Sequence, residues 1–193
     1  MIAFSAQYDR ALALAAQAHA TQLRKGTPIP YVAHVVHVSV LLIRHGFAED
    51  IAIAGLLHDV VEDQDISLER IESEFGAEVA RIVEAVSERK SVAGIELPWE
   101  QRKAEKLAHL RAGGPSVAAV KAADGIHNLR SVIADFGVLG PALWARFKRG
   151  PDAMLGYYRA TADGVRSWLG DHAIAIELEA AVDELAALIA GGT

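Results

Sequence analysis

The feature that most constrains the fold is a series of apolar segments in which small aliphatic residues recur at three- and four-residue steps. This spacing predicts α-helices with one buried face. No run of the chain alternates strictly between apolar and polar residues as a half-buried strand would. Alanine, the strongest helix former, is abundant, whereas aromatic residues make up only 6% of the chain. The sequence therefore predicts an all-α fold and argues against a β-barrel.

Glycine and proline divide the chain into about nine predicted helices. The strongest break is Gly113-Gly114-Pro115, and Ser116 follows it as the expected cap of the next helix. Ser67 is expected to cap a short helix that Gly76 ends. The other expected elements are helices over 6–23, 32–44, 49–61, 77–89, 100–111, 117–133, 151–169 and 174–189, a loop over 90–99 and a short element over 141–148.

The length of 193 residues is typical of one domain. We expect a single domain over 1–193, with the residues that carry its motifs at about 19–131 and closing helices at about 151–190. The net charge of −6 argues against a protein whose main task is to coat nucleic acid or an anionic membrane. The chain has no cysteine, which excludes disulfides and iron–sulfur clusters. Any metal ligands must be His, Asp or Glu.

The beginning of the chain lacks both a basic start and a continuous apolar stretch, so no signal peptide is predicted. The longest apolar run, 35–43, is interrupted by His37 and Ser39. It is much shorter than the ~20 residues that span a bilayer. We therefore expect a cytoplasmic protein.

Four ionisable residues lie in one apolar helical segment, LLHDVVED at 56–63. Unpaired charge is expensive in such a segment, so these groups need compensation. Residues four apart share a helix face, which places His58 beside Glu62 and Asp59 beside Asp63. A cation held between His58 and Asp59 would be flanked by Glu62 and Asp63. The alternative is a helix end at which His58 and Asp59 form a buried pair and the two acidic residues are solvated.

Two more polar residues stand alone on apolar helices, His34 and Asp124. With His58 and Asp59 they make a set of two nitrogen and two oxygen ligands, which suits Mn²⁺, Fe²⁺ or Zn²⁺ better than Ca²⁺ or Mg²⁺. His37 competes with His34, because it lies three residues further on much the same face. We favour His34 as the ligand and expect His37 in the core or beside a ligand.

Four further histidines are not expected to bind metal. His19 and His109 have polar neighbours and are expected to be solvated, while His45 and His172 lie near predicted helix ends.

Three blocks of the sequence, in this order, resemble a known family. They are RKG…PYVAH at 24–34, HDVVED at 58–63 and KAADGIHNLR at 121–130. The chain resembles the HD-domain hydrolase half of the RelA/SpoT alarmone enzymes, and more closely their stand-alone relatives, the Mesh-type small alarmone hydrolases. A lone His-Asp pair is a weak signal, but three ordered blocks are specific. The resemblance implies an all-helical HD fold without the synthetase and regulatory domains of the long enzymes.

The resemblance also implies an activity, the removal of pyrophosphate from the 3′ position of guanosine tetra- or pentaphosphate, (p)ppGpp. One Mn²⁺ would be held by His34, His58, Asp59 and Asp124, although other divalent metals are open. Glu62 and Asp63 match the family's acidic catalytic pair, which activates or orients water.

Five further residues match positions that the family uses to bind the nucleotide. Arg24 and Lys25 match residues that hold the base and phosphates, Asn128 and Ser131 match polar positions in the nucleotide pocket, and Tyr157 matches a tyrosine near the 3′ group. A planar guanidinium and a compact ammonium together suit a polyphosphate ligand. The alternative for the basic pair is a solvated loop.

The sequence departs from the family pattern at three places. Val35 replaces a usual proline, Gly125-Ile126 replaces a basic-leucine pair, and Ser131 replaces a threonine. The four metal ligands are retained, whereas the substrate is left open. Alternatives are an adenosine analogue such as ppApp, the 2′-phosphate of NADPH, or a nucleoside monophosphate.

A different class of function is a metal-free nucleotide-binding or scaffold protein on the same fold. The intact ligands and the acidic pair argue against it. A basic cluster at Arg146, Lys148 and Arg149 could receive the pyrophosphate end of a substrate or simply be solvated. The expected partner is a small-molecule nucleotide substrate, and no nucleic-acid or membrane partner is expected. A homodimer is an alternative to a monomer, because apolar helix faces could form a dimer interface.

Overall fold

The computed structural model describes residues 5–63, 66–92 and 94–191, with the side chain of Asp63 excluded. This part of the chain is helical apart from one two-stranded hairpin, which confirms the predicted all-α class. The elements are α1 (Ala6–Ala18), α2 (Val32–Arg44), α3 (Glu49–Leu57), α4 (Val60–Asp63), α5 (Leu68–Phe75), α6 (Ala77–Val86), β1 (Ser91–Val92), β2 (Ile95–Glu96), α7 (Trp99–Leu139), the 3₁₀ helix η1 (Gly140–Arg146), α8 (Pro151–Leu169) and α9 (Ala173–Gly191).

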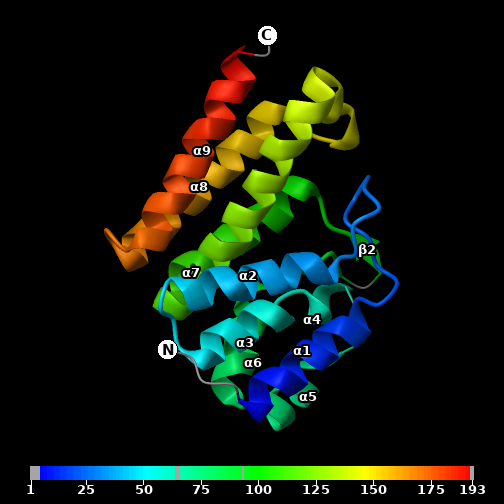
Figure 1. Ribbon diagram of the computed structural model, residues 1–193, viewed down its shortest axis with the longest axis vertical. Helices are drawn as coiled ribbons and strands as arrows, with labels where there is room; N and C mark the ends of the chain where they lie inside the picture. Colours follow the sequence, from blue (N-terminus) through cyan, green and yellow to red (C-terminus); the bar gives the residue numbers. More distant parts are fainter. Residues whose placement is uncertain (1–4, 64–65, 93, 192–193) are drawn as a thin grey trace.

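The helices form two packed groups that α7 connects (Figure 1). Helices α1 to α6 occupy the lower part of the view, and α8 and α9 pack side by side with the C-terminal half of α7 in the upper part. Within the lower group, helix α2 lies next to the upper group and contacts both α3 and α7. Among the described helices, none has the length and apolar character needed to cross a membrane.

The core explains why these segments form buried helices. Its largest fully buried side chains are aliphatic, including Leu42 on α2, Ile53 on α3 and Leu178 on α9. Helices α2 and α3 approach closely at Gly55, where an added Cβ would lie 2.6 Å from Leu42 Cδ1. Burial of such side chains contributes about 1.5–3 kcal/mol each, which offsets the loss of chain entropy.

Several boundaries differ from the sequence prediction, and each difference has a local cause. The first helix ends at Ala18, because residues 22–31 form a loop closed by hydrogen bonds from Arg24 N to Ile29 O and from Tyr31 N to Gln22 O. The predicted helix 49–61 is interrupted at His58 and gives α3 and α4. The expected loop over 90–99 contains the β1–β2 pair, whose two-residue strands are too short for a recognisable alternation.

The break at residues 113–115 is a sharp kink inside α7. Gly114 has φ 82° and ψ −177°, a conformation that only glycine adopts readily. Ser116 therefore lies inside the second half of the helix, and the prediction that it is the cap was wrong. The second half also continues to Leu139, six residues beyond the predicted end at 133.

Candidate metal centre and adjoining cavities

Three separate elements bring the four predicted metal ligands together. His34 lies in the first turn of α2, His58 and Asp59 form the junction between α3 and α4, and Asp124 lies on the second half of α7. The side chains of His34 and His58 are only 1% and 4% exposed. The interruption of the helix at the His58-Asp59 pair thus falls at the centre of the candidate site.

The ligand atoms of these residues converge on one point. Nε2 of His34 lies 3.3 Å from Asp124 Oδ1 and 3.8 Å from Asp59 Oδ2. Nε2 of His58 lies 3.1 Å from Asp59 Oδ2 and 3.8 Å from Asp124 Oδ1. The ligand atoms of His34, His58 and Asp59 all lie within 4.8 Å of one another, close enough to share one ion.

Neighbouring groups orient all four side chains. His58 Nδ1 donates to the carbonyl oxygen of Gly55 at 2.8 Å, which turns Nε2 toward the carboxylates of the cluster. Tyr31 donates to Asp59 Oδ2 at 2.5 Å, and Asn128 Nδ2 donates to Asp124 Oδ1 at 2.5 Å. The sequence reasoning did not single out Tyr31.

His127 orients His34 and was another residue that the sequence reasoning missed. The Nδ1 atoms of the two rings are hydrogen-bonded at 2.7 Å. Burial, together with the charges of His34 and Arg24, lowers the pKa of His127 to about 3, so this ring is neutral. Its place one turn after Asp124 was the available signal, because a histidine that binds metal usually has a partner on its second ring nitrogen.

The electrostatics of the cluster favour a positive charge. Burial alone would lower the pKa of His58, but the Asp59 carboxylate outweighs it and raises that pKa to about 9. Burial opposes ionisation of Asp59 and Asp124 as well, yet the adjacent histidines hold the pKa of both carboxyls below the usual range. A buried point at which two carboxylates face two imidazoles is suited to a cation.

The chemistry of the cluster also fits a metal rather than a closed hydrogen-bond network. Within the described residues, the buried Nε2 of His58 lies 3.1 Å from the Asp59 carboxylate but forms no hydrogen bond of normal geometry. A buried polar atom without a partner costs about 1–3 kcal/mol. A dication at the point of convergence would give this nitrogen a partner, so the donor types and the arrangement of the four residues fit a divalent-metal site.

Of the predicted acidic pair, Glu62 follows the cluster on α4. Its side chain is 12% exposed, and Oε2 accepts a hydrogen bond of 2.9 Å from the backbone N–H of Glu88. Lys90 and Lys106 lie 3.4 Å and 3.7 Å from its carboxylate. The side chain of Asp63 lies outside the described residues, and its role stays a prediction.

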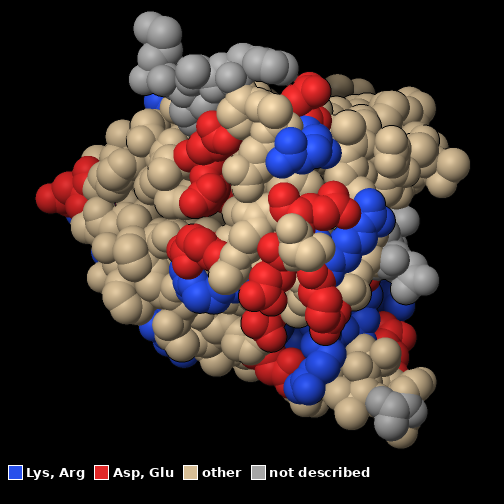
Figure 2. All heavy atoms as spheres, turned by 90° about the horizontal axis from the view of Figure 1, so that it is seen from below, with Lys and Arg blue, Asp and Glu red and all other residues tan. Residues whose placement is uncertain are grey.

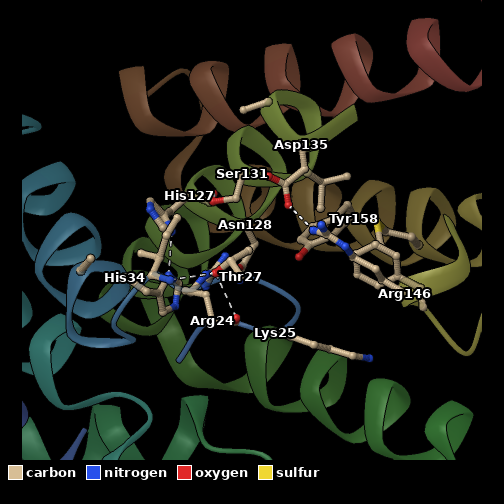
Figure 3. A pocket seen from close by; sticks show the side chains of 16 residues that line it. Arg24, Lys25, Thr27, His34, His127, Asn128, Ser131, Asp135, Arg146 and Tyr158 are labelled. Atoms are coloured by element: carbon tan, nitrogen blue, oxygen red, sulfur yellow. Dashed lines mark hydrogen bonds and ion pairs between the residues drawn. The ribbon is translucent and has the colours of Figure 1, made fainter. Parts of the chain in front are cut away.

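A cavity of about 390 Å³ begins at His34 and extends away from the cluster (Figure 3). Four predicted substrate-binding residues, Arg24, Lys25, Asn128 and Ser131, line it. Arg24 Nη2 donates to Asn128 Oδ1 at 3.0 Å, whereas Lys25 extends along the cavity, away from Arg24.

A second cavity of about 320 Å³ adjoins the first, and Lys25 and Tyr158 line both. The structure places Tyr157 in this second cavity rather than in the one beside His34. Its described lining contains no acidic residue. The basic residues that line it are Lys25, Arg102, Lys103, Lys148 and Arg149. These side chains give a local excess of positive charge in an acidic protein.

The predicted basic cluster is divided between the two cavities. Arg146 lines the first cavity and forms an ion pair of 2.8 Å with Asp135, while Lys148 and Arg149 line the second. On the face seen from below, acidic side chains gather among basic ones (Figure 2). Ion pairs within one helix also occur, such as that of Glu78 with Arg81 on α6 at 2.7 Å.

The expectation for His19 was wrong, and that for His37 was wrong in one of its two alternatives. His19 is buried rather than solvated, because its ring packs against Tyr31 with centroids 4.9 Å apart and its Nδ1 contacts Gln22 Oε1 at 2.6 Å. His37 is exposed rather than in the core, and its ring lies 4.5 Å from that of His127. It therefore contacts the residue that orients His34.

The HD domain model matches residues 11–146, which include all four candidate metal ligands. This chain belongs to the HD-domain family. Mouse MESH1, named guanosine-3′,5′-bis(diphosphate) 3′-pyrophosphohydrolase, is 38% identical over 133 residues, covering 66% of this chain and 70% of MESH1. The HD-domain protein thus belongs to the Mesh-type branch that its sequence resembles. A probable enzyme of the same name from Synechocystis is 41% identical over 126 residues, 65% of this chain but only 16% of that longer protein.

Solved structures support the same assignment for this HD-domain protein. One, described as a metazoan ortholog of SpoT that hydrolyses ppGpp, superimposes with a TM-score of 0.76 and 31% identity and covers 96% of each chain. A protein from Listeria monocytogenes superimposes with a TM-score of 0.70 and 33% identity, covering 78% of this chain and 96% of its own. The Mesh-type HD fold therefore extends over nearly the whole chain.

Proposed function

We propose that this HD-domain protein is a metal-dependent (p)ppGpp 3′-pyrophosphohydrolase. The observation that carries the proposal is the position of the His34, His58, Asp59 and Asp124 cluster, which lies at the end of a basic, nucleotide-sized cavity. The name and activity of the Mesh-type relatives support the same reaction. Water would attack the 3′-diphosphate, and the bond between the 3′ oxygen and its phosphorus would break, releasing pyrophosphate.

We propose Mn²⁺ as the resident ion, because two histidine nitrogens and two carboxylate oxygens suit a borderline metal better than Ca²⁺ or Mg²⁺. When bound, such an ion neutralises phosphate charge and lowers the pKa of water in the site. Tyr31, Asn128 and Gly55 hold the ligand side chains in place through the hydrogen bonds described above. The four ligands then need little rearrangement on binding.

The acidic pair handles the proton in this proposal. Glu62 lies four residues after His58, on α4, and the backbone N–H of Glu88 fixes its Oε2 atom. Its carboxylate, with Asp63 as the predicted partner, accepts the proton that the attacking water loses. Orientation by a backbone group favours a fixed geometry for this transfer.

The two cavities divide the nucleotide between them. Arg24, Asn128 and Ser131 would contact the base and ribose in the cavity beside His34. Lys25 lines both cavities and would contact phosphate where they join, and the basic lining of the second cavity suits the 5′-diphosphate. Tyr157 lies in that second cavity and would contact the 5′-diphosphate rather than the 3′ group that the resemblance implies.

We further propose that residues 1–193 act as one hydrolase domain located in the cytoplasm. A homodimer also stays a prediction.

Product analysis tests the activity. Purified protein with Mn²⁺ is incubated with ppGpp, ppApp or NADPH, and nucleotide and phosphate products are separated by ion-exchange chromatography. We expect GDP and pyrophosphate from ppGpp, and loss of turnover in Asp59→Ala. Asp171→Asn is the matched control, because the side chain of Asp171 is 86% exposed.

Other products would change the assignment. Release of inorganic phosphate from NADPH, without release of pyrophosphate from ppGpp, would show that the substrate is the 2′-phosphate of NADPH and not (p)ppGpp. Faster turnover of ppApp than of ppGpp would show that the preferred base is adenine rather than guanine. No turnover of any of the three with Mn²⁺ would contradict the proposed hydrolase function.

A further inference from the structure

The Glu88 side chain is a buried centre of ion pairs outside the predicted site. Glu88 follows the C-terminus of α6, and its side chain is only 4% exposed. One carboxylate oxygen lies 2.5 Å from Arg102 Nη1, and the other lies 2.6 Å from Lys103 Nζ and 3.3 Å from Lys106 Nζ. Burial would raise the pKa of Glu88, but the charges of Lys106, Lys103 and Arg102 outweigh it and lower the pKa to about 2.

The same residue contacts Glu62 in two ways. Its backbone N–H donates to Glu62 Oε2 at 2.9 Å. Its carboxylate also shares Lys106 with Glu62, at 3.3 Å and 3.7 Å. Lys106 is therefore held between the two acids, and a displacement of Glu88 would change both contacts to Glu62.

The segment that carries Glu88 is fixed on both sides. Buried Lys121 on α7 donates to the carbonyl oxygen of Val86 at 2.7 Å. Ser87 Oγ donates to Val83 O at 2.8 Å and lies 3.4 Å from the carbonyl oxygen of His58. These bonds connect the end of α6 to α7 and to the metal-binding junction.

The basic partners of Glu88 reach the second cavity. Arg102 and Lys103 line it, and Lys103 Nζ lies 5.1 Å from the centre of the Tyr157 ring. All three basic partners lie on the first half of α7, where they follow one another at positions 102, 103 and 106. Their mutual repulsion in a half-buried setting requires an anion, and Glu88 supplies it.

We propose that Glu88 is a positioning residue that couples Glu62 to the phosphate-binding cavity. Its carboxylate fixes Arg102 and Lys103 at the cavity wall, while its N–H and the shared Lys106 fix Glu62. The inference rests on the proposed hydrolase function for its kinetic consequences, but the coupling itself is a property of the fold.

Glu88→Gln tests the proposal, because it keeps the size and the backbone contact but removes the charge. Relative to wild type, we expect kcat for ppGpp to fall at least tenfold, with partial recovery in Glu88→Asp. The affinity for Mn²⁺, measured by competition with a chelator, should change less than twofold, since Glu88 contacts no metal ligand in the described residues. A merely structural defect would weaken turnover and metal binding together.

The matched control is Glu177→Gln. Glu177 also accepts from two basic groups, Arg44 and His45, but at the C-terminal end of α2, whereas His34 lies at the other end. Kinetic constants of Glu88→Gln within twofold of those of Glu177→Gln would overturn the proposal. So would equal losses of turnover and of metal affinity.

Binding of inorganic pyrophosphate to the metal-free protein gives a readout without turnover. Removal of one negative charge alone would tighten binding, whereas loss of fixed Arg102 and Lys103 is expected to raise the Kd at least threefold. A lower Kd in Glu88→Gln would contradict the positioning role even if the wild-type protein hydrolyses ppGpp. Absence of ppGpp turnover in wild type, with the Kd raised as expected, would instead overturn only the proposed function.

Discussion

Asn128 connects the nucleotide cavity to the metal cluster through a single side chain. Its Oδ1 atom accepts from Arg24 at 3.0 Å, and its Nδ2 atom donates to the predicted metal ligand Asp124 at 2.5 Å. The sequence resemblance assigns Asn128 to the pocket alone. The structure adds a contact to a ligand carboxylate, and this contact orients Asp124.

Asn128→Leu should therefore weaken metal binding. The change keeps the approximate volume and removes both hydrogen bonds, and loss of such a ligand-orienting contact typically costs 10–100-fold in metal affinity. We expect an increase of about tenfold in the Mn²⁺ Kd, measured by chelator competition without nucleotide. Ser131→Ala is the control, because Ser131 lines the same cavity but donates to His127 O. Equal Kd values for the two variants would show that Asn128 serves the nucleotide only.

Single residues also show how far the sequence could be interpreted. His34, His58, Asp59 and Asp124 could be selected because each is a polar residue on an apolar helix, and the structure brings them together. Tyr31 and Glu88 could not be selected in this way, since each lies at or beyond a helix end, where polar residues are ordinary. Their partners are 28 and 26 residues distant in sequence, at Asp59 and Glu62.

At the scale of elements, helix periodicity located most helices and misplaced their ends. The bounds of α2 and α8 match the predicted ranges, because Gly46 and Gly170 follow them and Pro151 opens α8. The break between α3 and α4 was not predicted, since the apolar pattern continues through His58. Gly125, which stands where the family usually has a basic residue, lies against α9. An added Cβ there would lie 3.0 Å from Leu178 Cδ1, so the two helices pack closely at this position.

The kink in α7 sets the relative placement of its two halves, which carry Lys106 and Asp124. Gly114→Ala should destabilise the fold by about 1–3 kcal/mol, because a residue with a Cβ is strained at φ 82° and ψ −177°. No atom lies within 4 Å of the added Cβ, so the cost is one of backbone conformation. Urea unfolding followed by circular dichroism measures the change.

Gly137→Ala is the matched control for this prediction. Gly137 lies on the same helix, is exposed, and has no atom within 4 Å of an added Cβ. Alanine should stabilise the helix there by about 0.5–1 kcal/mol. Equal effects of the two substitutions would show that the chain at Gly114 does not need the glycine conformation.

At the scale of the whole molecule, the predicted metal ligands lie on helices from separate parts of the chain. Those on α2 and at the α3–α4 junction belong to the lower group of helices, and Asp124 belongs to the half of α7 that packs with α8 and α9 (Figure 1). An ion that binds all four residues bridges the two groups. Because the predicted site needs both groups in place, we expect the ion to bind the folded chain only and to stabilise it.

Removal of metal should therefore lower the unfolding temperature. An ion at 100 times its Kd stabilises the folded state by about 2.7 kcal/mol, and about 1 kcal/mol shifts Tm by roughly 2–4 °C in a chain of this size. We expect a fall of about 5–10 °C on addition of a chelator, measured by differential scanning calorimetry, and recovery with Mn²⁺. Asp124→Asn should abolish the metal-dependent part of the shift, while Asp171→Asn should retain it. The same shift in both variants would place the stabilising ion outside this cluster, and the two helical groups would then be held together by apolar packing alone.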